Sequence, residues 1–313
     1  MSLKSKYLKL FIKATEMAAI GAYNLIGKHD KISADKAAVD NMRGEFNKID
    51  MDGKIVIGEG EMDKAPMLYI GESVGTKKGQ KIDLAVDPLE GTNFVAKNLP
   101  NSYSVLAAAE RNNLFFAPDT YMEKIAIGPN LPANLVDLDN AVEKNIELLS
   151  KAKNTTPNKI TVCILDRPRH AKVISSLKKM NVKIKLISDG DVSGVIYVID
   201  KESPVDMYLG IGGGPEGVLA AAALSCYDAQ MQTRLVLDEK ESVRAKKMGI
   251  KNLKKKYSLN EMVKDDVMFC ATAITNGDFG DGVTEKGDFY ETTTMALHKD
   301  GNVRGFFKNK HKK

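Results

Sequence analysis

The chain has 313 residues, of which 43% are hydrophobic and 28% charged, and its formal net charge is +5. This composition is typical of a soluble globular protein with one large or two medium domains, and it excludes disordered and collagen-like chains. The lysine-rich end, KNKHKK, accounts for part of the charge excess. We interpret that end as solvated and frayed, and we predict no binding to nucleic acid.

The first predicted element is an amphipathic helix. Apolar residues recur at helical spacing among lysines, at Tyr7, Leu10, Phe11, Ala14, Met17 and Ala18. The segment has neither the pattern of a signal peptide nor the length of a membrane span. A second helix follows a break at GKHDKIS and runs to about residue 46.

Three cysteines, Cys163, Cys226 and Cys270, are widely spaced and lie in apolar runs. An odd number at such spacing indicates buried thiols and favours neither a disulfide framework nor a zinc site. We therefore expect a protein of the reducing cytoplasm, without membrane association.

Two β-rich runs, KIVIGEGE (54–61) and KIDLAVDP (81–88), each end in acidic residues, and a further strand is predicted in SYSVLAAAER. If the first two strands are neighbours in a sheet, their carboxylates come together. Clustered anions repel unless a cation lies among them. Oxygen-only ligands favour Mg²⁺ or Mn²⁺, and carboxylates from two strands suit a two-metal site for phosphoryl displacement.

The acidic candidates before residue 130 are Asp35, Glu59, Glu61, Asp63, Asp87 and Glu90. Taken singly, each has a structural alternative. Asp35 is a candidate helix cap, and Asp87 a turn former before proline. Glu61 and Asp63 suit an exposed loop.

A glycine and a hydroxyl follow this acidic turn directly. Gly91 would let the backbone pass close to a phosphate. Thr92 could orient a metal-bound water with its hydroxyl. Both belong to the stretch VDPLEGTNF.

The second half of the chain alternates between strands and helices. A polar-faced helix at 134–154 could bridge two lobes, and β-α-β alternation follows it up to about residue 237. Such alternation predicts parallel strands joined by right-handed crossovers. We predict two α/β lobes, 1–154 and 155–313 with a soft boundary, and a cleft between them.

The stretch LDRPRH lies where a strand passes into a helix. Pro168 suits the first helical turn, so Arg167 and Arg169 stand near a helix N-terminus. Free N–H groups and guanidinium donors bind phosphate well there. The alternative is a solvated pair of arginines.

The stretch LISDGDVSG is a strand that ends in Asp-Gly-Asp, and it resembles the start of a haloacid-dehalogenase-type phosphatase. In that family the first aspartate, here Asp189, attacks phosphorus covalently. The family expects Thr or Val where Ser193 stands. Asp189 and Asp191 could equally accept hydrogen bonds from sugar hydroxyls, or could form an exposed turn.

The stretch GGGPEG, between a strand and a helix, satisfies the glycine pattern of a dinucleotide-binding module, and Asp238 stands near the position of a ribose-binding acid. Against this hypothesis, Glu216 would face a pyrophosphate with like charge and Pro215 lacks an N–H. Both difficulties disappear if Glu216 holds a metal. A noncatalytic sugar-phosphate sensor is a further alternative.

The motif DPLEGT resembles the signature of the lithium-sensitive, metal-dependent sugar and inositol phosphatases. Together with IVIGEGEMDKAPMLYIGE, PDTYMEKIAIGP, DRPRH, SDGDVSG, GIGGGPEG and ITNGDFGDGV, in the family's order from about residue 33 to 298, it makes the chain similar to class II fructose-1,6-bisphosphatases. The resemblance implies an α/β fold with α-β-α-β-α layers. It also implies a cytoplasmic homo-oligomer, a dimer or tetramer.

The activity implied is hydrolysis of the 1-phosphate of fructose 1,6-bisphosphate in gluconeogenesis. The attacking water would be activated by two or more Mn²⁺ or Mg²⁺ ions, and lithium would inhibit the enzyme. The alternative is a related phosphatase acting on sedoheptulose 1,7-bisphosphate or an inositol phosphate. The resemblance also implies roles for particular residues. The implied metal ligands are Asp35, Glu59, Asp87, Glu90 and Glu216, and the residues implied to act on the water are Asp63 and Thr92. The implied substrate contacts are Glu90, Gly91, Thr92, Tyr121, Arg167, Pro168, Arg169, Asp189, Gly190, Asp191 and Gly213.

Overall fold

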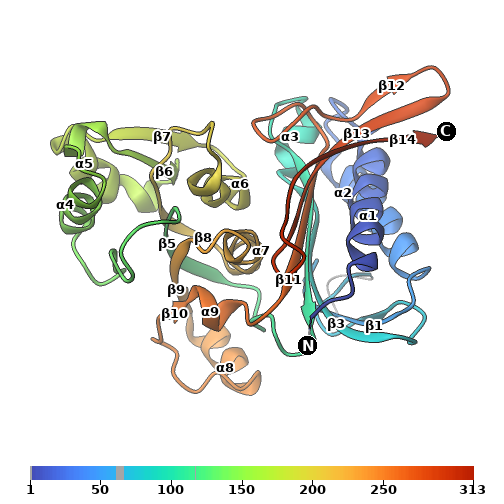
Figure 1. Ribbon diagram of the computed structural model, residues 1–313, viewed down its shortest axis with the longest axis horizontal. Coiled ribbons are helices and arrows are strands. Elements are labelled where there is room, and N and C mark those ends of the chain that lie inside the picture. The colour runs from blue at the N-terminus through green and yellow to red at the C-terminus, as the bar shows by residue number, and fades with distance from the viewer. Residues whose placement is uncertain (1, 61–66, 117) are drawn as a thin grey trace. The chain divides into compact units, whose positions relative to one another are not determined.

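The structure of this protein is a computed structural model that describes residues 2–60, 67–116 and 118–313 (Figure 1). It divides into two compact units, the first made of residues 1–116 and 263–313 and the second of residues 117–262. The predicted α/β class is confirmed. The division differs from the predicted lobes at 1–154 and 155–313, because the chain returns to the first unit at residue 263.

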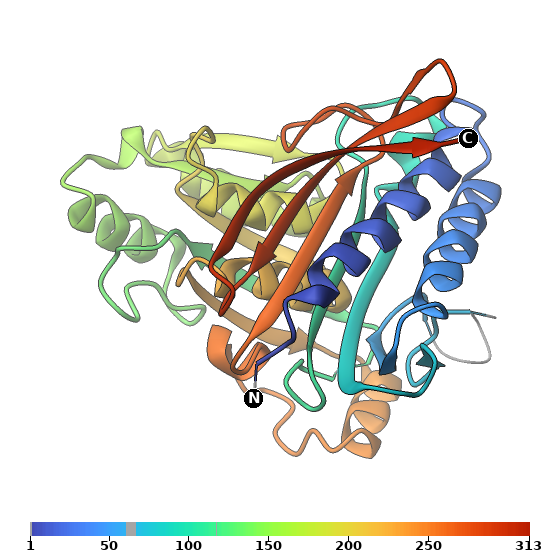
Figure 2. The same ribbon diagram turned by 45° about the vertical axis from the view of Figure 1, so that its right-hand side comes forward.

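The first unit contains α1 (Lys6–Tyr23), α2 (Lys31–Phe46), β1 (Met51–Ile57), β2 (Ser73–Val74), β3 (Gln80–Glu90), α3 (Thr92–Ala96), β4 (Tyr103–Glu110), β11 (Val267–Ala273), β12 (Thr284–Lys286), β13 (Phe289–His298) and β14 (Val303–Lys312). Its described strands form an eight-stranded sheet in the order β12-β13-β11-β4-β3-β1-β2, with β14 paired to β13. Helices α1 and α2 lie against one face of this sheet (Figure 2). The return of the chain is explained by β11, which pairs antiparallel with β4 along its whole length.

Helix α1 presents the predicted apolar stripe to the sheet. Tyr7, Phe11, Ala14 and Ala18 are buried, whereas Leu10 is 37% exposed and lies off the stripe. The packing of this stripe on the sheet stabilises the unit by removing apolar surface from water.

A buried carboxylate fixes α1 to the far end of the chain. Glu16 accepts hydrogen bonds from Thr292 Oγ1 at 2.9 Å and from Asn309 Nδ2 at 2.8 Å. His311 Nε2 lies 3.0 Å from its other oxygen. These contacts satisfy a charge that would otherwise be costly to bury.

The C-terminal end is a strand, so the prediction of a frayed tail is wrong. β14 pairs with β13 from Val303, opposite His298, to Lys312, opposite Phe289 (Figure 1). The backbone groups of an open strand edge offer partners to a following segment regardless of its side-chain charge. The lysines of KNKHKK therefore stand on an ordered edge strand, as lysines do on many sheet edges.

The second unit contains β5 (Tyr121–Ile127), α4 (Val142–Ala152), the 3-10 helix η1 (Pro157–Lys159), β6 (Thr161–Leu165), η2 (Pro168–His170), α5 (Ala171–Lys179), β7 (Lys183–Ile187), α6 (Asp191–Ile196), η3 (Tyr197–Ile199), β8 (Met207–Gly213), α7 (Gly214–Ser225), β9 (Gln230–Val236), α8 (Glu239–Lys247), β10 (Tyr257–Ser258) and α9 (Leu259–Met262). Its described strands follow the order β10-β9-β5-β8-β6-β7. β6 pairs parallel with β7 and β8, but β5 pairs antiparallel with both β8 and β9. β8 and β9 therefore run in the same direction, as predicted, but β5 lies between them and they do not pair with each other.

Helices cover both faces of the second sheet. On β5, Ile125 and Ile127 belong to a buried cluster with Leu149 of α4 and Leu177 of α5. Lys124 points to the opposite face, where α6 lies. The first unit thus has an α and a β layer, and the second has an α, a β and an α layer.

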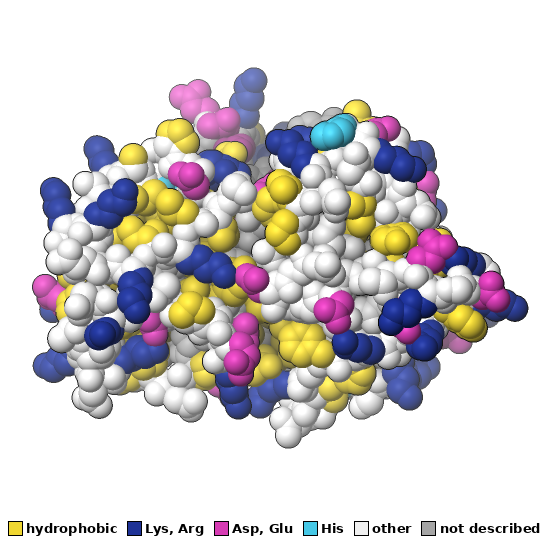
Figure 3. Space-filling model, turned by 90° about the horizontal axis from the view of Figure 1, so that it is seen from above, with side chains coloured by type: hydrophobic (Ala, Val, Ile, Leu, Met, Phe, Trp, Pro, Cys, Tyr) yellow, Lys and Arg dark blue, Asp and Glu magenta, His cyan; other side chains and the backbone are white. Residues whose placement is uncertain are grey.

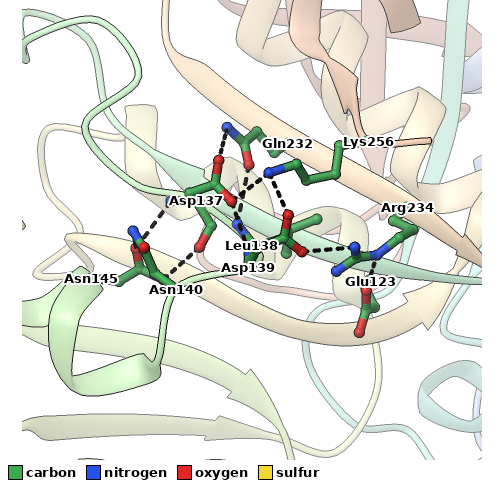
Figure 4. A network of polar contacts seen from close by, with 9 residues as sticks. All are labelled: Glu123, Asp137, Leu138, Asp139, Asn140, Asn145, Gln232, Arg234 and Lys256. Carbon is green, nitrogen blue, oxygen red and sulfur yellow. Dashed lines mark hydrogen bonds and ion pairs between the residues drawn. The ribbon is translucent and has the colours of Figure 1, made fainter. Parts of the chain in front are cut away.

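The predicted helix at 134–154 begins only at Val142. Asn134 has φ 55°, which a right-handed helix does not allow. The preceding segment is fixed instead by charge: Asp137 and Asp139 each accept from Lys256, at 2.6 and 2.7 Å (Figure 4). Because the segment and the helix lie within the second unit, they do not bridge the two units.

The three cysteines are buried and free, as predicted, and burial raises the pKa of Cys163 to about 12. None of the helices in the described ranges has the length and hydropathy that a membrane crossing requires. On the face drawn in Figure 3, Lys and Arg side chains are interspersed with Asp and Glu and do not gather into one basic area. That distribution gives no support to a nucleic-acid interface on this face.

Candidate active site

The two strands that end in carboxylates are neighbours in the first sheet. β1 pairs parallel with β3, from Met51 opposite Gln80 to Ile57 opposite Ala85. Parallel neighbours end at the same edge of the sheet. Glu59, two residues past the end of β1, therefore lies at the same edge as the acidic residues that end β3. The condition on which the metal hypothesis depended is met. Glu61 and Asp63 lie outside the described residues.

A β-bulge brings Asp87 and Glu90 to the same side of β3. In a regular strand, residues three apart point to opposite faces. Here Asp87 is opposite Val105 but Glu90 is opposite Tyr103, so β3 has one extra residue at this point. The extra residue restores the common face, and carboxylate oxygens of Asp87 and Glu90 lie within 4.8 Å of each other. Bulges often re-aim side chains beside active sites.

The turn after the bulge is built on glycine. Gly91 has φ 78°, a left-handed conformation that glycine adopts without steric cost, and it directly precedes the first residue of α3, Thr92. Ser102 Oγ donates to the Glu90 carbonyl at 2.8 Å, and the Phe94 N–H donates to the Gly91 carbonyl at 2.8 Å. The hydroxyl of Thr92 is thereby held two residues from a buried carboxylate.

Asp35 is not the cap of its helix. Asp30 caps α2 by accepting from the Ser33 N–H at 3.0 Å, which leaves Asp35 within the helix. Burial raises the pKa of Asp35. Helix α2 contacts both β3 and α3, so this half-buried carboxylate belongs to the same part of the first unit as Asp87 and Thr92.

A pocket of about 430 Å³ lies within the second unit. Among the residues that line it are seven that the sequence implicated: Tyr121, Arg167, Arg169, Asp189, Asp191, Gly213 and Glu216. Asp119, Thr120, Leu165, Gly212 and Glu241 also line it and had not been predicted. The predicted contacts Pro168 and Gly190 are direct chain neighbours of lining residues.

Arg169 is held in place before any ligand binds. Its guanidinium donates twice to the Ile211 carbonyl, at 2.7 and 3.1 Å, and stacks on the Tyr121 ring with 4.9 Å between Cζ and the ring centroid. Arg167 contributes Nη1 to the carbonyl of the preceding Asp166, at 3.0 Å. Pro168 starts η2 as the first-turn preference of proline predicts.

His170 does not line this pocket but supports residues beside it, and we did not identify it from the sequence. It is buried, with Nδ1 2.7 Å from the Leu165 carbonyl and Nε2 2.8 Å from the Ile211 N–H. Nδ1 therefore carries the proton and Nε2 accepts, and burial lowers the pKa of the ring. Arg169 thus binds the carbonyl of Ile211 and His170 binds its N–H, so both backbone groups of Ile211 have side-chain partners. The signal in the sequence that could have identified His170 is its position at the end of the DRPRH motif.

Two turns supply the predicted carboxylates of the pocket, Asp189, Asp191 and Glu216. Gly190, with φ 77°, separates Asp189 from Asp191 and allows both side chains to reach the cavity. Gly213 leaves room for the Glu216 carboxylate in its present position: a Cβ there would lie 1.8 Å from Glu216 Oε2, and the carboxylate would have to move.

The dinucleotide-binding hypothesis does not fit this unit. In that module the two parallel strands of the β-α-β unit lie side by side, but here β5 separates β8 from β9, the strand that follows α7. Asp238 caps α8 by accepting from the Glu241 N–H at 2.8 Å. Its carboxylate already has a structural role.

This α/β protein has carboxylate ligands at the end of a strand, and a pocket lined by arginine, aspartate and glycine. These features are typical of a metal-dependent phosphatase. The family model described as "Bacterial fructose-1,6-bisphosphatase, glpX-encoded" matches residues 6–311. The chain belongs to this family.

Curated relatives agree along nearly the whole chain. The chain is 40% identical to "Fructose-1,6-bisphosphatase 1 class 2" of Escherichia coli K12, over 92% of this chain and 89% of that protein. It is also 40% identical to the class 2 enzyme of Haemophilus influenzae, over 92% and 90%. Among solved structures, it is similar to the Thermotoga maritima IMPase (TM-score 0.36, 17% identity, 62% of this chain and 72% of that one) and the Bartonella henselae suhB protein (0.35, 13%, 63% and 73%).

Proposed function

We propose that this protein hydrolyses the 1-phosphate of fructose 1,6-bisphosphate to give fructose 6-phosphate and inorganic phosphate, as a step of gluconeogenesis. The observation that carries the proposal is the bulge in β3, which places the carboxylates of Asp87 and Glu90 within 4.8 Å of each other beside Gly91 and Thr92. This arrangement occurs in a chain that matches the fructose-1,6-bisphosphatase family over residues 6–311.

The donor set suits divalent cations. Two carboxylates this close repel each other unless positive charge lies between them. Their oxygens are hard ligands of the kind that Mg²⁺ and Mn²⁺ prefer. We assign the proposed ligands as Asp35, Glu59, Asp87, Glu90 and Glu216. Bound there, two or more such ions would neutralise charge on the phosphoryl oxygens and lower the pKa of the attacking water.

The protein's own groups position the other reactants. The Thr92 hydroxyl orients the attacking water, with Asp63 as its partner in that task. Arg169, already fixed against Tyr121 and Ile211, binds an anionic group of the substrate without reorganisation, and Arg167 assists it. Asp189 and Asp191 accept hydrogen bonds from the sugar hydroxyls. Water adds to phosphorus, the bond to the sugar oxygen breaks, and that oxygen takes up a proton.

The main test is phosphate release from a panel of substrates, with Mg²⁺ or Mn²⁺ and then with excess chelator. We expect fructose 1,6-bisphosphate to give the highest kcat/KM, and sedoheptulose 1,7-bisphosphate, fructose 6-phosphate and inositol monophosphates to give lower values. Lithium should inhibit. Undiminished turnover after exhaustive chelation, or no release from fructose 1,6-bisphosphate, would refute the proposal.

A covalent mechanism through Asp189 is tested by trapping its intermediate. If Asp189 attacked phosphorus, acid quenching within a single turnover would leave a phosphorylated peptide that contains Asp189. Direct attack by water leaves that peptide unmodified at every time point. A phosphorylated Asp189 peptide would overturn the direct-water mechanism.

A cytoplasmic location and a homo-oligomeric state, a dimer or tetramer, are part of the proposal through family membership. Light scattering combined with size-exclusion chromatography measures the second directly. A monomer at micromolar concentration would contradict it.

A further inference from the structure

Beneath the pocket of the second unit lies a buried lysine that the reaction outlined above does not use. Lys124 is on β5, and its side chain is fully buried. Its Nζ donates to Asp191 Oδ2 at 2.5 Å, and the Asp191 side chain is itself only 6% exposed. Lysine is almost never fully buried without a partner, because removing its charge from water costs several kcal/mol.

Two glycines provide the space for this pair. A Cβ at Gly212 would lie 1.7 Å from Asp191 Oδ2 and 3.3 Å from Lys124 Nζ. A Cβ at Gly217 would lie 3.1 Å from Lys124 Cε. Neither glycine has a positive φ, so conformation does not require glycine at either position. The slot between β8 and the start of α7 is shaped to admit an ammonium group.

The pair is an expensive way to stabilise a fold. Apolar residues of similar volume often replace a buried ion pair without loss of stability, so its presence is better explained by what it positions. Asp191 lines the pocket, whereas Lys124 does not. The Asp191 side chain therefore binds Lys124 through Oδ2 and also lines the pocket.

We propose that Lys124 is a positioning residue for substrate recognition: it holds the Asp191 carboxylate in one orientation, so that Asp191 accepts a hydrogen bond from a hydroxyl of the sugar. The inference rests on the proposed function, whose sugar phosphate substrate it refines. A buried polar group that needs a hydrogen-bond partner discriminates strongly between a substrate that has the matching hydroxyl and one that lacks it. Lys124 thereby sets affinity and discrimination, while the phosphoryl chemistry belongs to other residues.

The first experiment compares Lys124→Met with the matched control Lys178→Met, which removes an exposed lysine on α5. Binding of fructose 6-phosphate is measured by calorimetry, and turnover with fructose 1,6-bisphosphate and with p-nitrophenyl phosphate, which lacks the sugar. We expect Lys124→Met to weaken binding and raise KM for the bisphosphate at least about tenfold, about 1.4 kcal/mol. Turnover of p-nitrophenyl phosphate should change little, and Lys178→Met should behave like the wild type.

A double variant separates positioning from stability. Lys124→Met alone leaves a carboxylate buried without its partner and should lower the melting temperature. Lys124→Met combined with Asp191→Asn removes both charges and should recover much of that loss, yet fructose 6-phosphate should still bind weakly. If affinity returned together with stability, the role of Lys124 would be structural and the proposal wrong.

Chemical rescue gives a third readout. Lys124→Ala removes the atoms from Cγ to Nζ, which propylammonium replaces. Added propylammonium should restore fructose 6-phosphate affinity in this variant, whereas tetramethylammonium, which cannot donate a hydrogen bond, should not. Equal effects of the two cations would count against the proposal.

The outcomes also separate this inference from the proposed function. Wild-type protein that binds fructose 6-phosphate but releases no phosphate from the bisphosphate would refute the function and leave the Lys124 comparison intact. Active enzyme whose Lys124→Met variant keeps its affinity and KM would refute the inference alone. Wild-type protein that fails to bind fructose 6-phosphate would overturn both.

Discussion

The turn at Gly91 allows a quantitative test of how backbone shape supports activity. Gly91→Ala adds one methyl group at φ 78°, where a residue with a Cβ is strained by about 1 kcal/mol relative to glycine. The new Cβ would also lie 2.8 Å from Phe94 Cδ2, closer than van der Waals contact. The ring or the turn must therefore shift, at a further cost of about 0.5–1.5 kcal/mol. We expect a total loss of about 1.5–2.5 kcal/mol in the free energy of unfolding.

The effect on activity should be larger than the effect on stability. Gly91 lies between the proposed ligand Glu90 and Thr92, so a shift of the turn changes the position of the hydroxyl relative to the carboxylate. A misplacement of about 1 Å can reduce the rate about a hundredfold. The assay is phosphate release from fructose 1,6-bisphosphate at saturating Mg²⁺, together with urea unfolding of the same preparations.

Two other glycines serve as comparisons. Gly44→Ala lies within α2, where a Cβ meets nothing within 4 Å, and it should stabilise the protein by about 0.5–1 kcal/mol and leave activity unchanged. Gly190→Ala, at φ 77° beside the pocket, should act mainly on KM. Wild-type kcat and wild-type stability in Gly91→Ala would refute the argument that this turn needs a left-handed residue.

Two further predictions concern a hydroxyl and a group of charges. Thr92→Val should lower kcat strongly with a modest change in KM, because the hydroxyl acts on the water in the transition state. The control Thr92→Ser should retain most of the rate. A raised KM with an unchanged kcat in Thr92→Val would contradict this role. In the network of Figure 4, burial alone would raise the pKa of Asp137, but its contacts with Lys256, the Asp139 N–H and Gln232 together outweigh burial and lower that pKa. Hydrogen bonds to Lys256 and Arg234 lower the pKa of Asp139. Folded-state pKa values below the unfolded ones, about 3.9, contribute stability that is present above that pH and lost as the pH falls through the folded values. Urea unfolding should therefore show that Lys256→Met loses less stability than wild type between pH 5 and pH 2. The exposed control Lys254→Met should behave like wild type. Equal losses in all three proteins would show that the pairing with Lys256 is not the source of the pH dependence.

The features that the sequence determined are those encoded by near neighbours. Helical spacing defined α1, turn and breaker residues separated it from α2, and β-rich runs placed β1 and β3 with acidic residues at their ends. Pro168 started a helical turn where it was expected, because its fixed φ acts locally. The lining residues Arg167, Arg169, Asp189 and Asp191 were found because motifs of a few residues carry them.

The tertiary structure decided everything that depends on a distant partner. The pairing of β11 with β4 joins residues 263–313 to the first unit, and β14 pairs with the edge of β13 although its lysines suggest a solvated tail. The separation of β8 from β9 by β5 is likewise invisible to the alternation of strands and helices. Strand choice reflects which pairing buries the most apolar surface and backbone over the whole chain, so a local pattern cannot specify it.

The same division holds within the active site. The sequence supplied Asp87 and Glu90, but the bulge that turns them to one side exists only through the register of β3 against β4. Lys124 and Asp191 are 67 positions apart, and the glycines that admit the pair were considered in the sequence only as part of the GGGPEG pattern. A lysine in a strand gives no sign of being buried until its partner is known, because the partner is what makes burial of the charge tolerable.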